Sequence, residues 1–264
     1  ENCDDINKTV SIDDRAIGIE GSSIYMKKGE KLTMKELLYA LLLQSANDAA
    51  EALAYAVAGS IEAFADMMNA KAAALGLTAT HFENPHGLDG ETHYTTAYEL
   101  SLIAAEALEN ELFAKIVSTE KKMIPLHNGT ATRLLVNHNR LLREYEDIIG
   151  VKTGFTKKCG RTLVSAAERD GVRLICVTLN DGDDWRDHRA LLDYGFSLYG
   201  EVRLAEVGEY TYTLPVCGGV SERVTVKNRE SLSRMLPETH GEITSVTELP
   251  RFLYAGVCEG DTIG

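Results

Sequence analysis

Two short polar segments hold the side chains of this chain that are best suited to chemistry. Ser45–Asn47 reads Ser-Ala-Asn, and Lys152–Gly154 reads Lys-Thr-Gly 107 positions later. A hydroxyl, a carboxamide and an ammonium can pass a proton, donate to a carbonyl and attract an anion. Acyl transfer uses such groups, because it needs a nucleophilic hydroxyl, a base for its proton and donors for the tetrahedral oxyanion. Either tripeptide alone arises often by chance, so the indication lies in the two together.

Two buried helices must position the first segment. Thr33 and Glu36 form a capping-box pattern, which predicts a helix that begins there. Residues 37–43 are apolar almost all round, so this helix should be buried. An alanine-rich helix is expected over about 48–58. Ser45 therefore lies where two buried helices join.

A small antiparallel sheet is expected around the second segment. Residues 148–156 read as a strand that contains Lys152, and residues 161–167 and 172–179 read as two more. A short turn joins the last two, which makes them antiparallel neighbours. We expect Lys152 on an edge strand of this sheet, with Ser45 facing it.

Caps, periodicity and turn signals predict the remaining elements. Residues 76–96 read as a loop dense in His, Asn, Gly and Pro, and residues 113–136 alternate as a β-hairpin around Asn128-Gly129. Helical periodicity then gives way to short β runs, so we place a domain boundary near 200–203. Further helices are expected over about 60–75, 95–104 and 185–199.

The two tripeptides together resemble the S-x-N and K-T-G elements of the penicillin-binding and serine β-lactamase group. Residues 76–88 and 93–97 are similar to the T-x-F-x-N-x-x-G-L and H-Y-S-T-A stretches of the low-molecular-mass D-alanyl-D-alanine carboxypeptidases, the peptidase S11 family. Residues 139–142 and 191–196 also match that family. The resemblance is strong over about 5–200 and continues weakly beyond.

The resemblance implies an α/β (α+β) architecture in two parts. Residues 1–202 would form a β-lactamase/transpeptidase-like catalytic domain with an antiparallel sheet and helices, incomplete at its N-terminus. Residues 203–264 would form a small all-β domain, also incomplete.

The function that the resemblance implies is that of a serine-type D-alanyl-D-alanine carboxypeptidase. Such an enzyme removes the terminal D-Ala from peptidoglycan stem pentapeptides through an acyl-serine intermediate and is inhibited by β-lactams. It works outside the cytoplasm, either secreted or at the outer face of the cytoplasmic membrane. Attachment to that membrane through a C-terminal segment outside this chain is compatible with this reading.

The resemblance assigns catalytic roles to three residues. Ser45 would relay a proton between the base and the leaving amine. Asn47 would donate to a substrate carbonyl and hold the base in place. Lys152 would depress the pKa of the base by its positive charge and attract the terminal carboxylate of the substrate. Helix capping is the structural alternative for Ser45 and Asn47.

Substrate binding falls to the residues that follow Lys152. Thr153 would hydrogen-bond the carboxylate, the strand from Gly154 would pair with the substrate, and the backbone N–H of Phe155 would enter the oxyanion hole. Arg186 is the nearest match to an arginine that the family uses on the same carboxylate. Its register is shifted, and an ion pair with its aspartate neighbours is equally compatible, so we leave it out of the site.

The chain departs from the family pattern at the nucleophile. The family's nucleophile is the Ser of an S-x-x-K motif several dozen residues before S-x-N, and none of the residues before Ser45 forms that motif. We therefore expect the nucleophile and its lysine to lie outside this chain, and the chain as it stands to be inactive. Ser118–Lys121 matches the letters, but it follows S-x-N in an expected hairpin, where solvated residues are the simpler reading.

Two other functions stay open. A serine β-lactamase of class A needs a Glu as deacylation base in an E-x-x-x-N pattern. Glu106 and Asn110 fit those letters but fall late, on an alanine-rich helix. A non-catalytic muropeptide- or β-lactam-binding module would also account for the missing nucleophile motif, and an N-terminal extension with S-x-x-K would separate it from the enzyme.

Composition excludes several other classes. Hydrophobic residues make up 44% and charged residues 25%, as in ordinary globular proteins. No window offers the roughly 18 uninterrupted apolar residues of a membrane span. The net charge of −13 repels phosphate backbones, so we expect no nucleic-acid partner.

We also expect no metal and no cofactor. His81, His86 and His93 lie close together with Glu83 and Asp89, a set that zinc could use. They fall in a Gly/Pro loop without the i, i+4 spacing of helical ligands, and the resemblance accounts for them as loop residues. The five cysteines form no C-x-x-C pair, and a bridge between the last two is left open.

Overall fold

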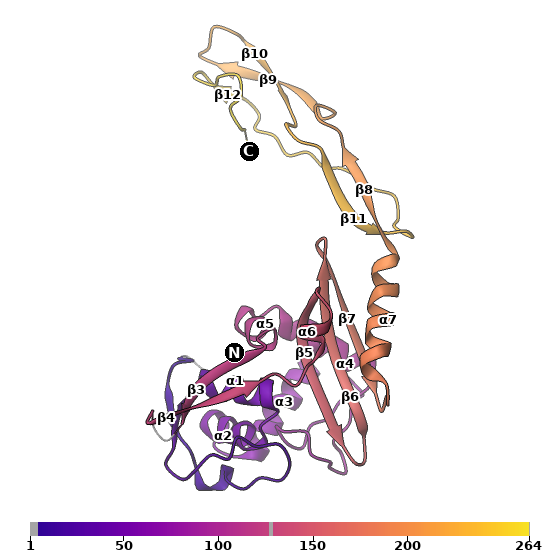
Figure 1. Cartoon of the computed structure of the whole chain (residues 1–264). Helices are drawn as coiled ribbons and strands as arrows, with labels where there is room; N and C mark the ends of the chain where they lie inside the picture. The colour runs from indigo at the N-terminus through magenta and orange to yellow at the C-terminus, as the bar shows by residue number, and fades with distance from the viewer. Residues whose placement is uncertain (1–4, 127–128, 264) are drawn as a thin grey trace. The chain divides into compact units, whose positions relative to one another are not determined.

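The computed structural model describes residues 5–126 and 129–263. The chain divides into two compact units, Glu1–Tyr194 and Gly195–Gly264 (Figure 1). This division falls before the predicted boundary at 202/203, because the last turn of a long helix groups with the second unit. The roles predicted for the two domains remain predictions.

Local signals begin and end the helices of the first unit. Thr33 accepts from the Glu36 N–H while the Glu36 carboxylate accepts from the Thr33 N–H, which completes the predicted capping box. Ser60 and Thr96 cap their helices through side-chain oxygens. The helices are α1 Met34–Gln44, α2 Asn47–Ala58, α3 Ile61–Ala74, α4 Ala97–Leu108, α5 Glu111–Val117, α6 Leu141–Glu144 and α7 Asp184–Ser197, with a 3-10 helix at Asp14–Ala16.

The helix α1 lies in the core of the first unit, as its apolar sequence predicts. Leu37, Ala40 and Leu43 are fully buried, and the leucines between them pack partly buried against the same cluster. Each buried leucine contributes about 1.5–3 kcal/mol. The end of α1, where Ser45 follows, is therefore firmly held.

Three antiparallel strands carry the second motif. They are β5 Ile148–Thr156, β6 Gly160–Arg169 and β7 Val172–Leu179, in the order β5-β6-β7. Val164 and Ala166 of β6 pack in the cluster that includes α4 residues, whereas Ser165 between them bonds His188 of α7. Because neighbouring side chains of a strand point to opposite faces, α4 and α7 cover opposite faces of this sheet.

The predicted hairpin over 113–136 is wrong in its first part. Residues 111–117 form the helix α5, because Asn110 caps the N–H groups of Leu112 and Phe113. Phe113, Ile116 and Val117 have helical spacing, which the alternation concealed. The hairpin is confined to β3 Lys121–Leu126 and β4 Ala131–Val136. Asn128 of its predicted turn lies outside the described residues.

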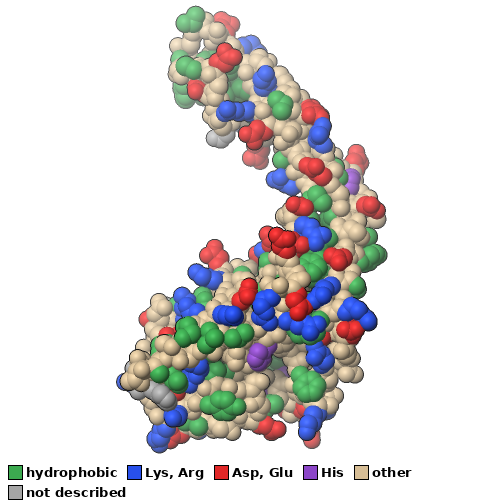
Figure 2. Space-filling model, viewed as in Figure 1, with side chains coloured by type: hydrophobic (Ala, Val, Ile, Leu, Met, Phe, Trp, Pro, Cys, Tyr) green, Lys and Arg blue, Asp and Glu red, His purple; other side chains and the backbone are tan. Residues whose placement is uncertain are grey.

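Two further strands and short loops complete the first unit. β1 Thr9–Ser11 and β2 Lys31–Thr33 pair antiparallel. On the face shown in Figure 2, basic and acidic side chains of this unit are interspersed. Among the described residues, no helix combines the length and the apolar character that crossing a bilayer requires.

The second unit is built of strands after the end of α7. Its strands are β8 Tyr199–Ala205, β9 Thr211–Cys217, β10 Arg223–Lys227, β11 Leu232–Pro237 and β12 Leu253–Tyr254. They form two small sheets, β10-β9-β12 and β11-β8. Cys217 and Cys258 are both free thiols, so the bridge left open between them is not formed.

Candidate active site

Ser45 occupies an unusual backbone position at the end of α1. It is the C-cap residue, with φ 55° and ψ 35°, the left-handed region. Bulky L-residues rarely adopt this conformation, so the surrounding structure must hold it. The following residue, Ala46, is the N-cap of α2, and no side chain caps that end of the helix. The Ser45 hydroxyl is therefore left for other partners.

Lys152 of β5 supplies the partner of that hydroxyl. The Lys152 ammonium donates to Ser45 Oγ and also to its neighbour's carbonyl, Thr153 O, at 2.6 Å. Burial lowers the pKa of Lys152 to about 8, because desolvation disfavours the charged form. The two motifs thus meet as predicted, with Lys152 on an outer strand of the three-stranded sheet.

Asn47 and Asp48 fasten a loop beside this contact. Asn47 Nδ2 donates to Glu20 O at 2.6 Å, and the Asn47 N–H donates to Ser22 O at 2.8 Å. The side chain of Asn47 therefore binds a loop instead of capping a helix. Gly21 approaches so closely that an added Cβ would lie 2.8 Å from Asn47 Nδ2.

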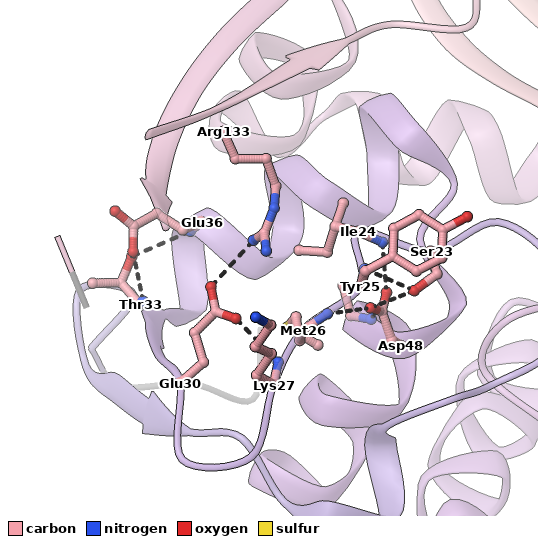
Figure 3. A network of polar contacts seen from close by, with 11 residues as sticks. Ser23, Ile24, Tyr25, Met26, Lys27, Glu30, Thr33, Glu36, Asp48 and Arg133 are labelled. Atoms are coloured by element: carbon pink, nitrogen blue, oxygen red, sulfur yellow. Dashed lines mark hydrogen bonds and ion pairs between the residues drawn. The ribbon is translucent and has the colours of Figure 1, made fainter. Parts of the chain in front are cut away.

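The buried Asp48 carboxylate holds the next stretch of the same loop (Figure 3). It accepts from Ser23 Oγ at 2.6 Å and from the Ile24 and Met26 N–H groups at 3.2 Å each. Tyr25 lies between these anchored residues with φ 58° and an exposed ring. Two adjacent residues at the start of α2 thus fix the loop 20–26 next to Ser45.

The substrate-binding candidates follow Lys152 along β5. Gly154 pairs with Thr162, and an added Cβ would collide with Thr162 Oγ1, so a larger residue would force that side chain to move. Thr153 is half-buried, and Phe155 is 69% exposed. Within the described residues, β5 pairs with β6 along one side.

The histidine loop makes local hydrogen bonds. His81 Nδ1 lies 2.8 Å from Thr92 O, and His93 Nδ1 accepts from the Glu83 N–H at 3.1 Å. His86 is partly buried, its Nε2 lies 3.4 Å from the Glu51 carboxylate, and desolvation lowers its pKa. In the described part of the chain, no three His, Cys, Asp or Glu side chains converge on a metal position.

Three residues that match other family patterns in the sequence make contacts at the protein surface. Ser118 is the C-cap of α5, and its hydroxyl donates to Lys115 O. Arg186 forms exposed ion pairs with the aspartates on either side of it in sequence, Asp183 and Asp187. Glu106 pairs with Lys71 at the surface, with 42% of its side chain exposed.

The sequence analysis did not identify His138, whose backbone lies beside the end of α1. The Val136 carbonyl accepts from Gln44 Nε2, and the His138 N–H donates to Leu43 O, so this segment lies against the residues just before Ser45. The family resemblance rests on the neighbouring residues 139–142 and does not include His138. The available indication in the sequence was a histidine, His138, between the two asparagines Asn137 and Asn139.

Comparison with known proteins identifies relatives of the chain. Residues 4–183 match the peptidase S11 family, described as D-alanyl-D-alanine carboxypeptidase. The chain is 33% identical over 228 residues to the D-alanyl-D-alanine carboxypeptidase DacF of Bacillus subtilis, covering 85% of this chain and 58% of DacF. It is 39% identical over 202 residues to DacB2 of Mycobacterium tuberculosis, covering 74% of this chain and 68% of DacB2.

Solved structures agree with the fold. The D-alanyl-D-alanine carboxypeptidase from Mycobacterium tuberculosis is 38% identical and superposes with a TM-score of 0.69 over 74% of this chain and 75% of its own. The carboxypeptidase DacD from Francisella tularensis is 27% identical, with a TM-score of 0.70 over 98% of this chain and 76% of its own. The mixed α/β fold with its antiparallel sheets is therefore that of these proteins, as predicted.

Proposed function

The chain belongs to the peptidase S11 family of D-alanyl-D-alanine carboxypeptidases, and from that premise we propose that its protein removes the terminal D-Ala from peptidoglycan stem pentapeptides outside the cytoplasm. The observation that carries the proposal is the contact of the Lys152 ammonium with the Ser45 hydroxyl. It brings the S-x-N and K-T-G motifs into one site.

The direction of this hydrogen bond suits a proton relay. An ammonium has donors and no acceptor, so Lys152 donates and the Ser45 oxygen accepts. The proton of the Ser45 hydroxyl is then free to point at another acceptor. In the proposed reaction, that acceptor is the leaving amine of D-Ala, and a base outside the Ser45–Lys152 pair returns the proton to Ser45.

The strand β5 supports the binding of an extended peptide. Lys152 would attract the terminal carboxylate, and Thr153 would hydrogen-bond it. The peptide would add to the side of β5 away from β6, with the Phe155 N–H as an oxyanion donor. Gly154 suits this strand because a side chain there would collide with the Thr162 hydroxyl.

The covalent step needs a serine that this site does not contain. Ser45 accepts from Lys152 at the end of α1, and Ser118 is occupied as a helix cap. We assign the acyl-serine to an S-x-x-K motif outside these 264 residues. A β-lactam would acylate that same serine, as expected for an inhibitor. The surface position of Glu106 disfavours the class A β-lactamase alternative.

The experiment compares this chain with a version extended at its N-terminus to include an S-x-x-K motif. Both are incubated with a fluorescent penicillin and analysed by intact mass, and D-alanine release is measured from an acetylated peptide ending in D-Ala-D-Ala. Labelling and release by the extended protein alone are expected. An adduct on Ser45 or Ser118 of this chain would overturn the assignment of roles, and rapid hydrolysis of the penicillin would favour the β-lactamase. Binding of the peptide without any acylation would favour the non-catalytic module.

A further inference from the structure

His138 is fixed beside the Ser45–Lys152 contact by backbone hydrogen bonds. Its N–H donates to Leu43 O at 3.1 Å, and Gln44 Nε2 donates to Val136 O at 2.7 Å. The segment 136–138 therefore runs along the last residues of α1. Since Ser45 comes next in the chain and touches Lys152, His138 lies at the same site.

Two buried asparagines hold His138 from either side. Asn137 and Asn139 are 3% and 1% exposed. Asn137 Nδ2 donates to Val117 O at 3.1 Å, and Asn137 Oδ1 accepts from the Asn139 N–H at 2.9 Å. His138 itself is exposed between them. Its backbone is thus rigid while its side chain is left outside the packed interior.

Desolvation and nearby cations both disfavour a charge on the His138 imidazole. Desolvation lowers the pKa of His138 first, and the positive charge of Lys152 on β5 lowers it further. Arg143 of α6 is a second cation on this segment, and it donates to Asn137 O at 3.5 Å. The adjoining residues of α1, Leu43 and Gln44, are uncharged. The His138 imidazole therefore takes up a proton less readily than a free histidine, and the relay described above does not use it.

We propose that His138 is a second anion-binding group of the site, which takes up a proton from solvent when the carboxylate of a ligand binds at Lys152. The inference rests on the proposed function, because it concerns the same terminal carboxylate. A bound carboxylate offsets the repulsion by Lys152 and offers the protonated imidazole an acceptor. The binding of the carboxylate and of one proton are then linked.

Calorimetry at pH 6.5 tests this proton uptake directly. This chain is titrated with an acetylated peptide that ends in D-Ala-D-Ala, and with the same peptide as its C-terminal amide, in MES and in Bis-Tris buffer, which have different heats of ionisation. The difference in heat between the buffers measures the protons taken up. Lys152, with its pKa of about 8, is already protonated at this pH, so the uptake reports on the imidazole.

The variants separate a charged role from a packing role. The wild type should take up a substantial fraction of a proton with the acid peptide and none with the amide. His138→Asn should bind the acid peptide several-fold more weakly without uptake, and His138→Arg should recover the affinity, again without uptake. His240→Asn, at an exposed histidine of the second unit, is the matched control and should behave as the wild type. Thermal unfolding confirms that each variant is folded.

The outcomes distinguish the two proposals. If the wild type and His138→Asn bind the acid peptide with equal affinity and equal proton uptake, the role of His138 is refuted while the carboxylate site stands. If the wild type does not discriminate between acid and amide, the carboxylate site fails, and the inference fails with it.

Discussion

The ammonium of Lys152, on the strand β5, donates a hydrogen bond to the hydroxyl of Ser45, at the end of the helix α1. This contact holds a charged group where burial lowers its pKa to about 8. Burial of an ammonium disfavours folding, because the charged form loses hydration. The burial of the Lys152 ammonium therefore opposes stability, and this cost can be measured.

Replacing Lys152 should separate function from stability. Lys152→Met keeps the length of the side chain and removes the charge, so the variant should lose binding of the D-Ala-D-Ala peptide and unfold at the same temperature as the wild type or higher. Lys158→Met, at the exposed hairpin after β5, is the control.

Because the pKa of Lys152 is lower in the folded than in the unfolded chain, wild-type stability should also rise between pH 8 and 10.5, and the Lys152→Met variant should lack that rise. Earlier unfolding of Lys152→Met at pH 7 would contradict this account.

The left-handed backbone of Ser45 predicts an inverted order for two substitutions. Ser45→Gly and Ser45→Ala both remove the hydroxyl, but only glycine adopts φ 55° without strain. The glycine variant should be more stable than the alanine variant by about 1 kcal/mol. Urea unfolding of the pair measures the difference, and an alanine variant of equal or greater stability would show that the backbone relaxes.

His188 should make the first unit sensitive to acid. Its ring is fully buried between Ser165 and Thr178, and burial lowers its pKa to about 4. The unfolded chain binds this proton near pH 6.5 and the folded chain only near pH 4, so stability falls as the pH drops between these values. The loss is about 3 kcal/mol for this group.

Unfolding at several pH values isolates the contribution of His188. His188→Gln should be less stable at neutral pH but should lose less stability on acidification, so the two curves converge toward pH 4. His240→Gln, exposed in the second unit, is the control and should leave the curve unchanged. Parallel curves for wild type and His188→Gln would mean that other groups carry the acid sensitivity.

Asp48 is predicted to hold the loop beside the site. Asp48→Asn replaces one acceptor oxygen by a donor that faces backbone N–H groups, so the variant should lose about 1–3 kcal/mol of stability. The loop 20–26 should then be cut faster by proteases than in the wild type. Asp66→Asn, on the exposed face of α3, is the matched control. If cleavage of the loop is unchanged, Asn47 alone suffices to fasten it.

Elements with local signals could be predicted from the sequence. The starts of the helices capped by Thr33, Ser60 and Thr96 and the strands around Lys152 were predicted within a residue or two, because caps and strand patterns are short-range features. The end of α4 was predicted four residues too early, at 104 instead of Leu108. The helix α5 was missed because the apolar residues 113 and 117 also fit a strand period, although 113, 116 and 117 together have helical spacing. Asn110 was the cap that decided between them.

The site could be predicted only in part. That Ser45 meets Lys152 came from the resemblance, since no local pattern relates residues so far apart. The position of His138 depends on hydrogen bonds that join β4 and the residues after it to the end of α1. Such long-range pairing cannot be predicted from the sequence of either segment alone. The roles assigned to Asn47, Thr153 and Phe155 remain predictions.

The sequence separation of 107 between Ser45 and Lys152 also has a consequence for folding kinetics. Bringing together residues so distant in sequence costs chain entropy that is recovered only when the intervening helices and strands have packed. We therefore expect this long-range contact to form late in the folding reaction. Recovery of ligand binding during refolding therefore reports that the whole first unit has formed, whereas a helix signal reports much less.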